Sequence, residues 1–215
     1  DHLAATVPCI ESHGGYVVQY LGDGIMALFP GDSDCALRAA IEMQKQFKEA
    51  FAARTEKLPM PLEMSIGIHA GPVSLGIVGN ETRWDASIIA DAVNTSARIE
   101  SMTRVLGGEI IVSQEFFDTL EGSSPFKLRS LGTHEIRGRA GRLELVEVMD
   151  SLPEDVLRSR LETHEDFSAG LEARRGGDLY GAMARFSQVL SRVPGDQAAL
   201  FHLARIGGAL RARFR

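Results

Sequence analysis

The chain has 215 residues, 44% hydrophobic and 24% charged, so it is long enough to bury one full core and a smaller second unit. Its formal net charge of −6 argues against a general nucleic-acid binder, because such proteins neutralise phosphates with an excess of basic residues. No apolar run has the length of a membrane span, and we expect no signal peptide. Cys9 and Cys35 lack metal-ligand spacing, so we expect reduced thiols and a cytoplasmic location, with any membrane tether of the complete protein lying upstream.

The first quarter of the chain is predicted to form a helix, a β-hairpin and a longer helix. Gly14-Gly15 ends the first helix, since glycine readily adopts the left-handed conformation found after helices. Gly22-Asp23-Gly24 lies between two short apolar, β-prone runs, which is a typical hairpin signal. An apolar stripe at helical spacing predicts the second helix. The predicted bounds are 1–13, 16–21, 25–29 and about 33–54.

The middle of the chain alternates between strand and helix patterns. We predict strands at 62–69, 73–78, 109–112, 126–136 and 143–149, helices at about 88–105 and 116–120, and a polar loop at 79–85. Strands interleaved with long helices predict an α/β fold, an α+β sandwich with one sheet and helices against one face.

After Asp150 the pattern is helical throughout, and Ser151-Leu152-Pro153 is a plausible linker. Small and aromatic residues between Ala169 and Ala199 follow the rhythm of a tetratricopeptide-like helical hairpin, although an ordinary helical hairpin is an equal alternative. One such hairpin cannot bury its own apolar face, so it must pack on the first domain, on a protein partner or on further repeats. We therefore divide the chain into domains at 1–150 and 151–215.

Asp23 is the first candidate for chemistry. It exposes a lone carboxylate on a tight turn, and the flanking glycines let an anionic ligand approach the backbone closely. A hard oxygen donor in this setting suits a Mg²⁺ ion that accompanies a nucleotide triphosphate. Taken alone, the turn is better explained as an ordinary Asp-Gly hairpin.

A second candidate group lies in the predicted helix that begins near residue 88. Asn94 and Arg98 are four residues apart and therefore share a face, with Asp91 one turn earlier. An amide beside a guanidinium suits a ribose oxygen and a phosphate. The alternative is an exposed polar face in which Arg98 pairs with Asp91 or Glu100.

Together these segments resemble the catalytic domain of the class III adenylate and guanylate cyclases, in its bacterial type. The segments occur in the order and spacing of that family over roughly residues 1–150. They are the Gly22-Asp23-Gly24 hairpin, Ser65-Ile66-Gly67-Ile68-His69-Ala70-Gly71-Pro72-Val73, Asp91-Ala92-Val93-Asn94-Thr95-Ser96-Ala97-Arg98 and the basic turn Ile136-Arg137-Gly138-Arg139. The resemblance implies a ferredoxin-like fold.

The resemblance also implies a signalling enzyme that converts ATP to 3′,5′-cyclic AMP and pyrophosphate. Two Mg²⁺ ions per site, with Mn²⁺ as a substitute, would assist the attack of the ribose 3′-hydroxyl on the α-phosphate. The enzyme would be a head-to-tail homodimer with shared sites. Asp23 matches a metal ligand and Arg137 a phosphate-binding lysine. Asn94 matches the ribose-orienting asparagine and Arg98 the transition-state arginine, both acting in the opposite subunit's site.

The substrate base is less firmly indicated. Gln19 stands where adenylate cyclases of this type usually have lysine and guanylate cyclases glutamate, and its amide can donate to adenine N1 or accept from guanine N1–H. Ser87, at the second base-reading position, is equally ambivalent. Family usage around Ser87 and Asp91 favours ATP, with GTP as the alternative.

One family element is missing. The first strand of the family, of the type Phe-x-Asp-Ile-x-Gly-Phe, carries a second metal aspartate and has no counterpart before Asp23. We expect this strand to precede Asp1 in the complete protein. A catalytically degenerate cyclase-like domain that binds a nucleotide or a partner is therefore a further alternative, as is a scaffold whose C-terminal helices bind another protein.

Overall fold

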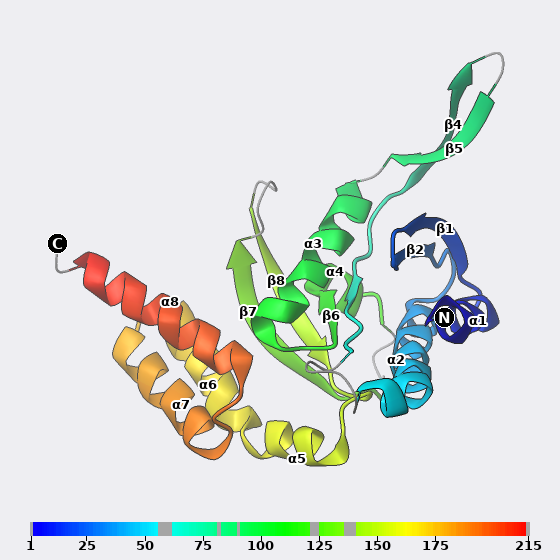
Figure 1. Cartoon of the computed structure of the whole chain (residues 1–215). Helices are drawn as coiled ribbons and strands as arrows, with labels where there is room; N and C mark the ends of the chain where they lie inside the picture. Colours follow the sequence, from blue (N-terminus) through cyan, green and yellow to red (C-terminus); the bar gives the residue numbers. More distant parts are fainter. Residues whose placement is uncertain are drawn as a thin grey trace.

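The computed structural model describes residues 2–55, 62–80, 83–89, 91–120, 125–135 and 141–213 (Figure 1). In chain order its elements are α1 (His2–Ser12), β1 (Tyr16–Leu21), β2 (Gly24–Leu28), α2 (Ser33–Thr55), β3 (Ile66–Ile68), β4 (Ser74–Asn80), β5 (Arg83–Ile89), α3 (Asp91–Leu106), β6 (Ile110–Ser113), α4 (Gln114–Phe117), β7 (Leu128–Glu135), β8 (Arg142–Val148), α5 (Glu154–Glu162), α6 (His164–Arg175), α7 (Leu179–Arg192) and α8 (Gln197–Arg213).

The predicted N-terminal hairpin is confirmed. Strands β1 and β2 pair antiparallel around a turn in which Gly22 has a φ of +66°, a conformation that glycine adopts without strain. Helix α1 ends at Ser12, Gly14 follows it with a φ of +75°, and α1 packs against α2 beside the hairpin (Figure 1).

A four-stranded mixed sheet forms the centre of the molecule, in the order β3-β6-β8-β7. Strands β3 and β6 are parallel, and helix α3 lies in the connection between them, whereas β6–β8 and β7–β8 are antiparallel. We predicted one sheet, but the described strands also form two separate hairpins, β1–β2 and β4–β5. In each hairpin the two strands hydrogen-bond to each other, and neither hairpin pairs with a described strand of the central sheet.

The β4–β5 hairpin corrects two predicted boundaries. We predicted a polar loop at 79–85 and a helix from about 88, but β5 occupies Arg83–Ile89 and α3 begins at Asp91. Strand β5 pairs in continuous register with β4, from Ser74–Ile89 to Asn80–Arg83. This cross-strand pairing decides the structure of a segment that we predicted as the end of a loop and the start of a helix. In Figure 1 the hairpin extends away from the central sheet.

Helices cover both faces of the central sheet, not one as predicted. Since neighbouring strand residues point to opposite faces, Ile110 and Val112 pack towards α2, whereas Ile111 packs into the core formed with α3 and the C-terminal helices. The residues that form this second core from the sheet and α3 are Ile99, Leu106, Ile111, Leu131, Leu143 and Leu145. The helices contribute Phe167, Ala182, Phe186, Val189, Ala198, Ala199 and Ile206.

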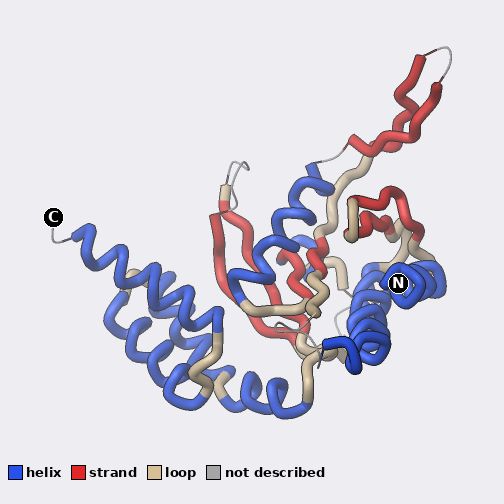
Figure 2. Tube along the Cα trace, viewed as in Figure 1, coloured by secondary structure: helices blue, strands red, loops and turns tan. Residues whose placement is uncertain are grey.

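The predicted helical hairpin after residue 150 is confirmed as α6 and α7, with α5 and α8 beside it (Figure 2). Asp178 caps α7, since its Oδ1 accepts a hydrogen bond of 2.8 Å from the amide of Gly181. Phe167 and Phe186 pack edge to face, with 5.3 Å between their ring centroids. Of the three predicted ways to cover the apolar face, the described residues use the first domain. The division at residue 150 into two domains stays a prediction.

None of the helices in the described part of the chain combines the length and the apolar character needed to cross a bilayer.

Candidate active site

Helix α3 carries three of the predicted site residues. Asp91 lies in its first turn and Asn94 one turn later, both exposed to solvent, whereas Arg98 is half-buried. The spacing of four residues places Asn94 and Arg98 on one face of the helix. Both residues therefore lie on α3 in the order that the helical spacing predicts, and their roles in a site stay a prediction.

Arg98 has an unsatisfied donor. Its Nη1 is buried and has no hydrogen-bond partner among the described residues. Glu100, one of the two alternative partners suggested by the sequence, instead accepts from Arg104 at 3.0 Å. A buried guanidinium nitrogen without an acceptor costs free energy, so its position favours an anionic ligand.

The position of α3 depends on a close approach to β3 at Gly67. Ser96 Oγ donates a hydrogen bond of 2.8 Å to the carbonyl of Gly67. A Cβ at Gly67 would overlap the backbone nitrogen of Glu100 and the backbone oxygen of Ser96, so only glycine fits here. Ser96 lies between Asn94 and Arg98 in the sequence, so its contact with Gly67 fixes the position of these two residues relative to β3.

Replacing Gly67 by alanine should therefore displace α3. We expect the free energy of unfolding to fall by about 1–3 kcal/mol, because the added methyl group meets backbone that cannot rotate away. We also expect the catalytic activity that the resemblance implies to fall, since Asn94 and Arg98 move with the helix. Urea unfolding and an activity assay measure the two effects.

Gly31→Ala is the matched control for this change. A Cβ at Gly31 has no atom within 4 Å, so this variant should keep the stability and the activity of the unaltered chain. Equal stability of the two alanine variants would contradict the proposed role of Gly67.

Asp23 and Gln19 lie on the β1–β2 hairpin. Asp23 is exposed, and its carboxylate forms no hydrogen bond or ion pair with the described residues. His2 Nε2 donates to the backbone carbonyl of Asp23 at 2.6 Å and ties the turn to the start of α1. Gln19 is exposed on β1, opposite Met26 and next to a register shift.

The structure does not join the two groups of predicted residues. No described hydrogen bond or ion pair connects Asp23 or Gln19 to α3, and the hairpin and α3 belong to different parts of the fold (Figure 1). The backbone of Ser87 lies on β5 opposite Gly76, shortly before α3. Arg137 lies outside the described residues.

A divalent cation fits the chemistry of Asp23. Mg²⁺ binds carboxylate, phosphate and water oxygens in an octahedron. Asp23 offers an exposed carboxylate that has no hydrogen bond or ion pair with a described residue. Within the described residues there is no group of three or more histidine, cysteine or acidic side chains that could hold a metal ion. The described part of the chain thus supplies one candidate ligand.

Gly67 and Ser96 position α3, yet sequence reasoning did not single them out. A glycine inside an alternating apolar strand was the available signal, since such a residue often marks a close backbone approach. Its partner on α3 could not be read from the sequence, because 29 residues separate Gly67 from Ser96.

Comparison with known proteins decides the family. Residues 3–149 match the family described as the adenylate and guanylate cyclase catalytic domain. The chain belongs to this family. The predicted resemblance and the mixed α/β cyclase fold are thereby confirmed, and the chain carries a class III nucleotidyl cyclase catalytic domain.

Three relatives illustrate the likeness of this cyclase domain. An adenylate cyclase of Anabaena cylindrica is 37% identical over 154 residues, which are 69% of this chain and 31% of that protein. The structure of the guanylyl cyclase Cya2 has a TM-score of 0.57 at 30% identity, covering 68% of this chain and 76% of that one. A bacterial light-regulated adenylyl cyclase shares the fold, with a TM-score of 0.61 at 22% identity over 74% of this chain and 48% of that one.

The cyclase domain thus spans about a third of the length of the Anabaena relative. The matched family ends at residue 149, so α5–α8 lie beyond it. Their tetratricopeptide character stays a prediction.

Proposed function

We propose that this cyclase domain converts ATP to 3′,5′-cyclic AMP and pyrophosphate. The proposal rests on the buried Nη1 of Arg98, which has no hydrogen-bond partner among the described residues, and on the exposed Asn94 four residues earlier on a helix within the matched family. An amide and an unsatisfied guanidinium on one face suit a ribose and a phosphate group. The adenylate cyclase of Anabaena cylindrica, at 37% identity, supports ATP as the substrate.

In this proposal, Asn94 hydrogen-bonds the ribose and holds its 3′-hydroxyl towards the α-phosphate. The hydroxyl loses its proton to water as its oxygen forms a bond to the α-phosphorus. The bond from that phosphorus to the oxygen of the β-phosphate breaks, and pyrophosphate leaves with the electron pair of that bond. Arg98 donates hydrogen bonds to the phosphate oxygens, on which negative charge grows during the attack. Arg137 is proposed to bind the phosphates as well, as in the matched motif.

Asp23 is proposed to hold the divalent cation. Two Mg²⁺ ions, or Mn²⁺ in their place, would lower the pKa of the hydroxyl and neutralise the leaving group when bound. The backbone of Asp23 is held to α1 by the hydrogen bond from His2, and Gly22 and Gly24 flank it. The carboxylate therefore projects from a fixed backbone position into open space.

We propose a head-to-tail homodimer in which each site takes Asp23 from one subunit and Asn94 with Arg98 from the other. The absence of any described hydrogen bond or ion pair between the hairpin and α3 within one chain supports this arrangement. A dimer of this kind contains two equivalent sites related by its two-fold axis.

A product assay tests the proposed function. The purified protein is incubated with ATP or with GTP in Mg²⁺ or Mn²⁺, and the nucleotides are separated by chromatography. We expect cyclic AMP and an equal amount of pyrophosphate from ATP. No cyclic product from either nucleotide, in a protein that binds them, would indicate the degenerate cyclase-like domain instead.

Guanylate cyclase is the second candidate. Gln19 carries a neutral amide that can accept as well as donate a hydrogen bond, so it excludes neither purine. The guanylyl cyclase Cya2 is also 30% identical to this chain. Cyclic GMP as the main product of the assay would favour this candidate.

Substitution of Gln19 should change the base preference. Gln19→Lys presents only donors, which suits adenine N1 and opposes guanine N1–H, so the ratio of kcat/KM for ATP over GTP should rise. Gln19→Glu should lower this ratio. One hydrogen bond contributes about 0.5–1.5 kcal/mol net, so each change should be about two- to tenfold.

Tyr20 offers matched controls for this prediction. It is exposed on the neighbouring position of β1, whose side chain points to the other side of the strand. Tyr20→Lys and Tyr20→Glu should leave the ratio unchanged. If both Gln19 variants also leave it unchanged, Gln19 does not contact the base.

A further inference from the structure

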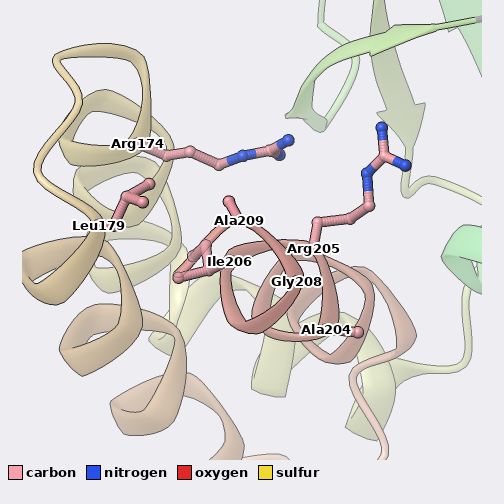
Figure 3. Close-up of a pocket in the computed structure, with 7 residues that line it drawn as sticks. All are labelled: Arg174, Leu179, Ala204, Arg205, Ile206, Gly208 and Ala209. Carbon is pink, nitrogen blue, oxygen red and sulfur yellow. The ribbon is translucent and has the colours of Figure 1, made fainter. Parts of the chain in front are cut away.

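A pocket of about 400 Å³ lies between α6 and α8, outside the residues of the candidate active site. Leu179 and Ile206 form apolar parts of its wall, and small residues of α8, including Gly208, leave room inside it. Two arginines, Arg174 from α6 and Arg205 from α8, line the same space (Figure 3). A volume of this size is in the range of small-molecule sites.

The charges around this pocket are not balanced within the described residues. Glu135 lies 3.2 Å from Arg142 and 4.0 Å from Arg205, whereas Arg174 has no carboxylate within ion-pair distance among the residues that the structure describes. Three guanidinium groups thus share one carboxylate, a local excess of two positive charges. Burial, followed by the charges of Arg205 and Arg142, holds the pKa of Arg174 below its ordinary value. An anion between the arginines would relieve this repulsion.

Arg174 is held in place by a buried histidine. Its Nη1 donates to His202 Nδ1 at 2.5 Å, and His202 Nε2 donates to the carbonyl of Leu131 at 3.0 Å. His202 is fully buried, and burial together with Arg174 and His134 lowers its pKa to about 3, so it stays neutral and accepts the hydrogen bond at Nδ1. The other donors of Arg174 have no partner among the described residues, which leaves them available to a ligand.

We propose that this pocket binds the phosphate group of a small molecule. A guanidinium presents its donors in a planar fork that matches two phosphate oxygens, and Arg174 and Arg205 can each supply one fork to the same dianion. Figure 3 shows the Arg174 side chain extending over Ala209 towards the side on which the Arg205 guanidinium lies. The apolar wall beside them leaves space for the body of a phosphorylated molecule. This site lies beyond the proposed cyclase function and does not depend on it.

Two pairs of variants test the proposal. Arg174→Leu removes one fork, and Arg175→Leu removes the same charge from the exposed neighbour that does not line the pocket. Gly208→Leu fills the pocket without changing any charge. Gly207→Leu is its control, because a Cβ at either glycine has no atom within 4 Å and only Gly208 lines the pocket.

Binding of inorganic phosphate, phenyl phosphate and benzoate is measured by calorimetry at low ionic strength, in an Arg98→Ala background that weakens phosphate binding at the candidate active site. We expect one saturable phosphate site, a Kd raised about tenfold or more by Arg174→Leu, and no binding to Gly208→Leu. Arg175→Leu and Gly207→Leu should bind like the background protein. Thermal unfolding checks that all four variants are folded.

The three probes separate the sources of the phosphate group. Tighter binding of phenyl phosphate than of inorganic phosphate supports a phosphorylated organic ligand, and equal binding supports free phosphate. The proposal is overturned if phosphate does not saturate, if either variant binds like its control, or if benzoate binds as tightly as phenyl phosphate.

Discussion

Two inactive variants, Asp23→Ala and Arg98→Ala, should recover cyclase activity when they are mixed. Alone, each should lose about two orders of magnitude or more in kcat, since one removes the proposed cation ligand and the other the phosphate donor. In a head-to-tail dimer the two changes damage opposite halves of each site. Half of the dimers in a random mixture contain both variants, and one of their two sites is intact, so about a quarter of the normal activity should return.

Glu11→Ala is the matched control for Asp23→Ala. Glu11 is an exposed acidic residue of α1. Its backbone carbonyl accepts a hydrogen bond from Gly14, and its carboxylate has no partner among the described residues. This variant should keep full activity. Near-normal activity of Asp23→Ala or of Arg98→Ala alone would contradict the role proposed for that residue. If subunit exchange is demonstrated and activity still does not return, the shared site is wrong.

A buried network of four charges joins the central sheet to the C-terminal helices. Arg129 of β7 lies 2.7 Å from Asp196, which precedes α8, and 3.4 Å from Glu147 of β8. Arg160 of α5 also pairs with Asp196 and lies 3.9 Å from Glu147. Burial alone would raise the pKa of Asp196, but Arg129 and Arg160 outweigh it and the pKa lies below its ordinary value. The guanidinium of Arg129 also stacks on the ring of Phe167, at 3.7 Å from its centre.

Arg129→Met should therefore destabilise the whole chain. It leaves two buried carboxylates with Arg160 as their only cationic partner among the described residues, and breaking such a buried pair costs about 3–5 kcal/mol. Urea unfolding should show this loss as a lower midpoint with an unchanged slope. We expect the sheet and the C-terminal helices to unfold in one transition, because the network and the shared core span both.

Arg158→Met provides the comparison at the surface. Arg158 pairs with Glu154 at 3.2 Å, but both side chains are mostly exposed to solvent. Exposed pairs of this kind contribute about 0–1 kcal/mol, so the midpoint should hardly move. If the two methionine variants are equally stable, the buried network does not hold the helices on the sheet.

Local sequence patterns were sufficient to predict the elements whose backbone hydrogen bonds join residues that are close in the sequence. Gly22-Asp23-Gly24 between two apolar runs predicted the β1–β2 hairpin, and the apolar stripe from Cys35 to Phe47 predicted α2. The shared face of Asn94 and Arg98 followed from helical spacing alone. Strand β5 was missed because its structure comes from pairing with β4, which no local pattern in the sequence records.

The sequence by itself was enough to predict the family, the residue types of the candidate site and the helical character of the C-terminal segment. Only the tertiary structure decided where that segment packs, because its partners Ile111, Leu143 and Leu145 are distant in the chain. It also decided why Gly67 must be glycine and why Glu147, in an alternating strand, is buried and not exposed. Each of these features depends on contacts between residues far apart in sequence, which no local pattern of composition or spacing records.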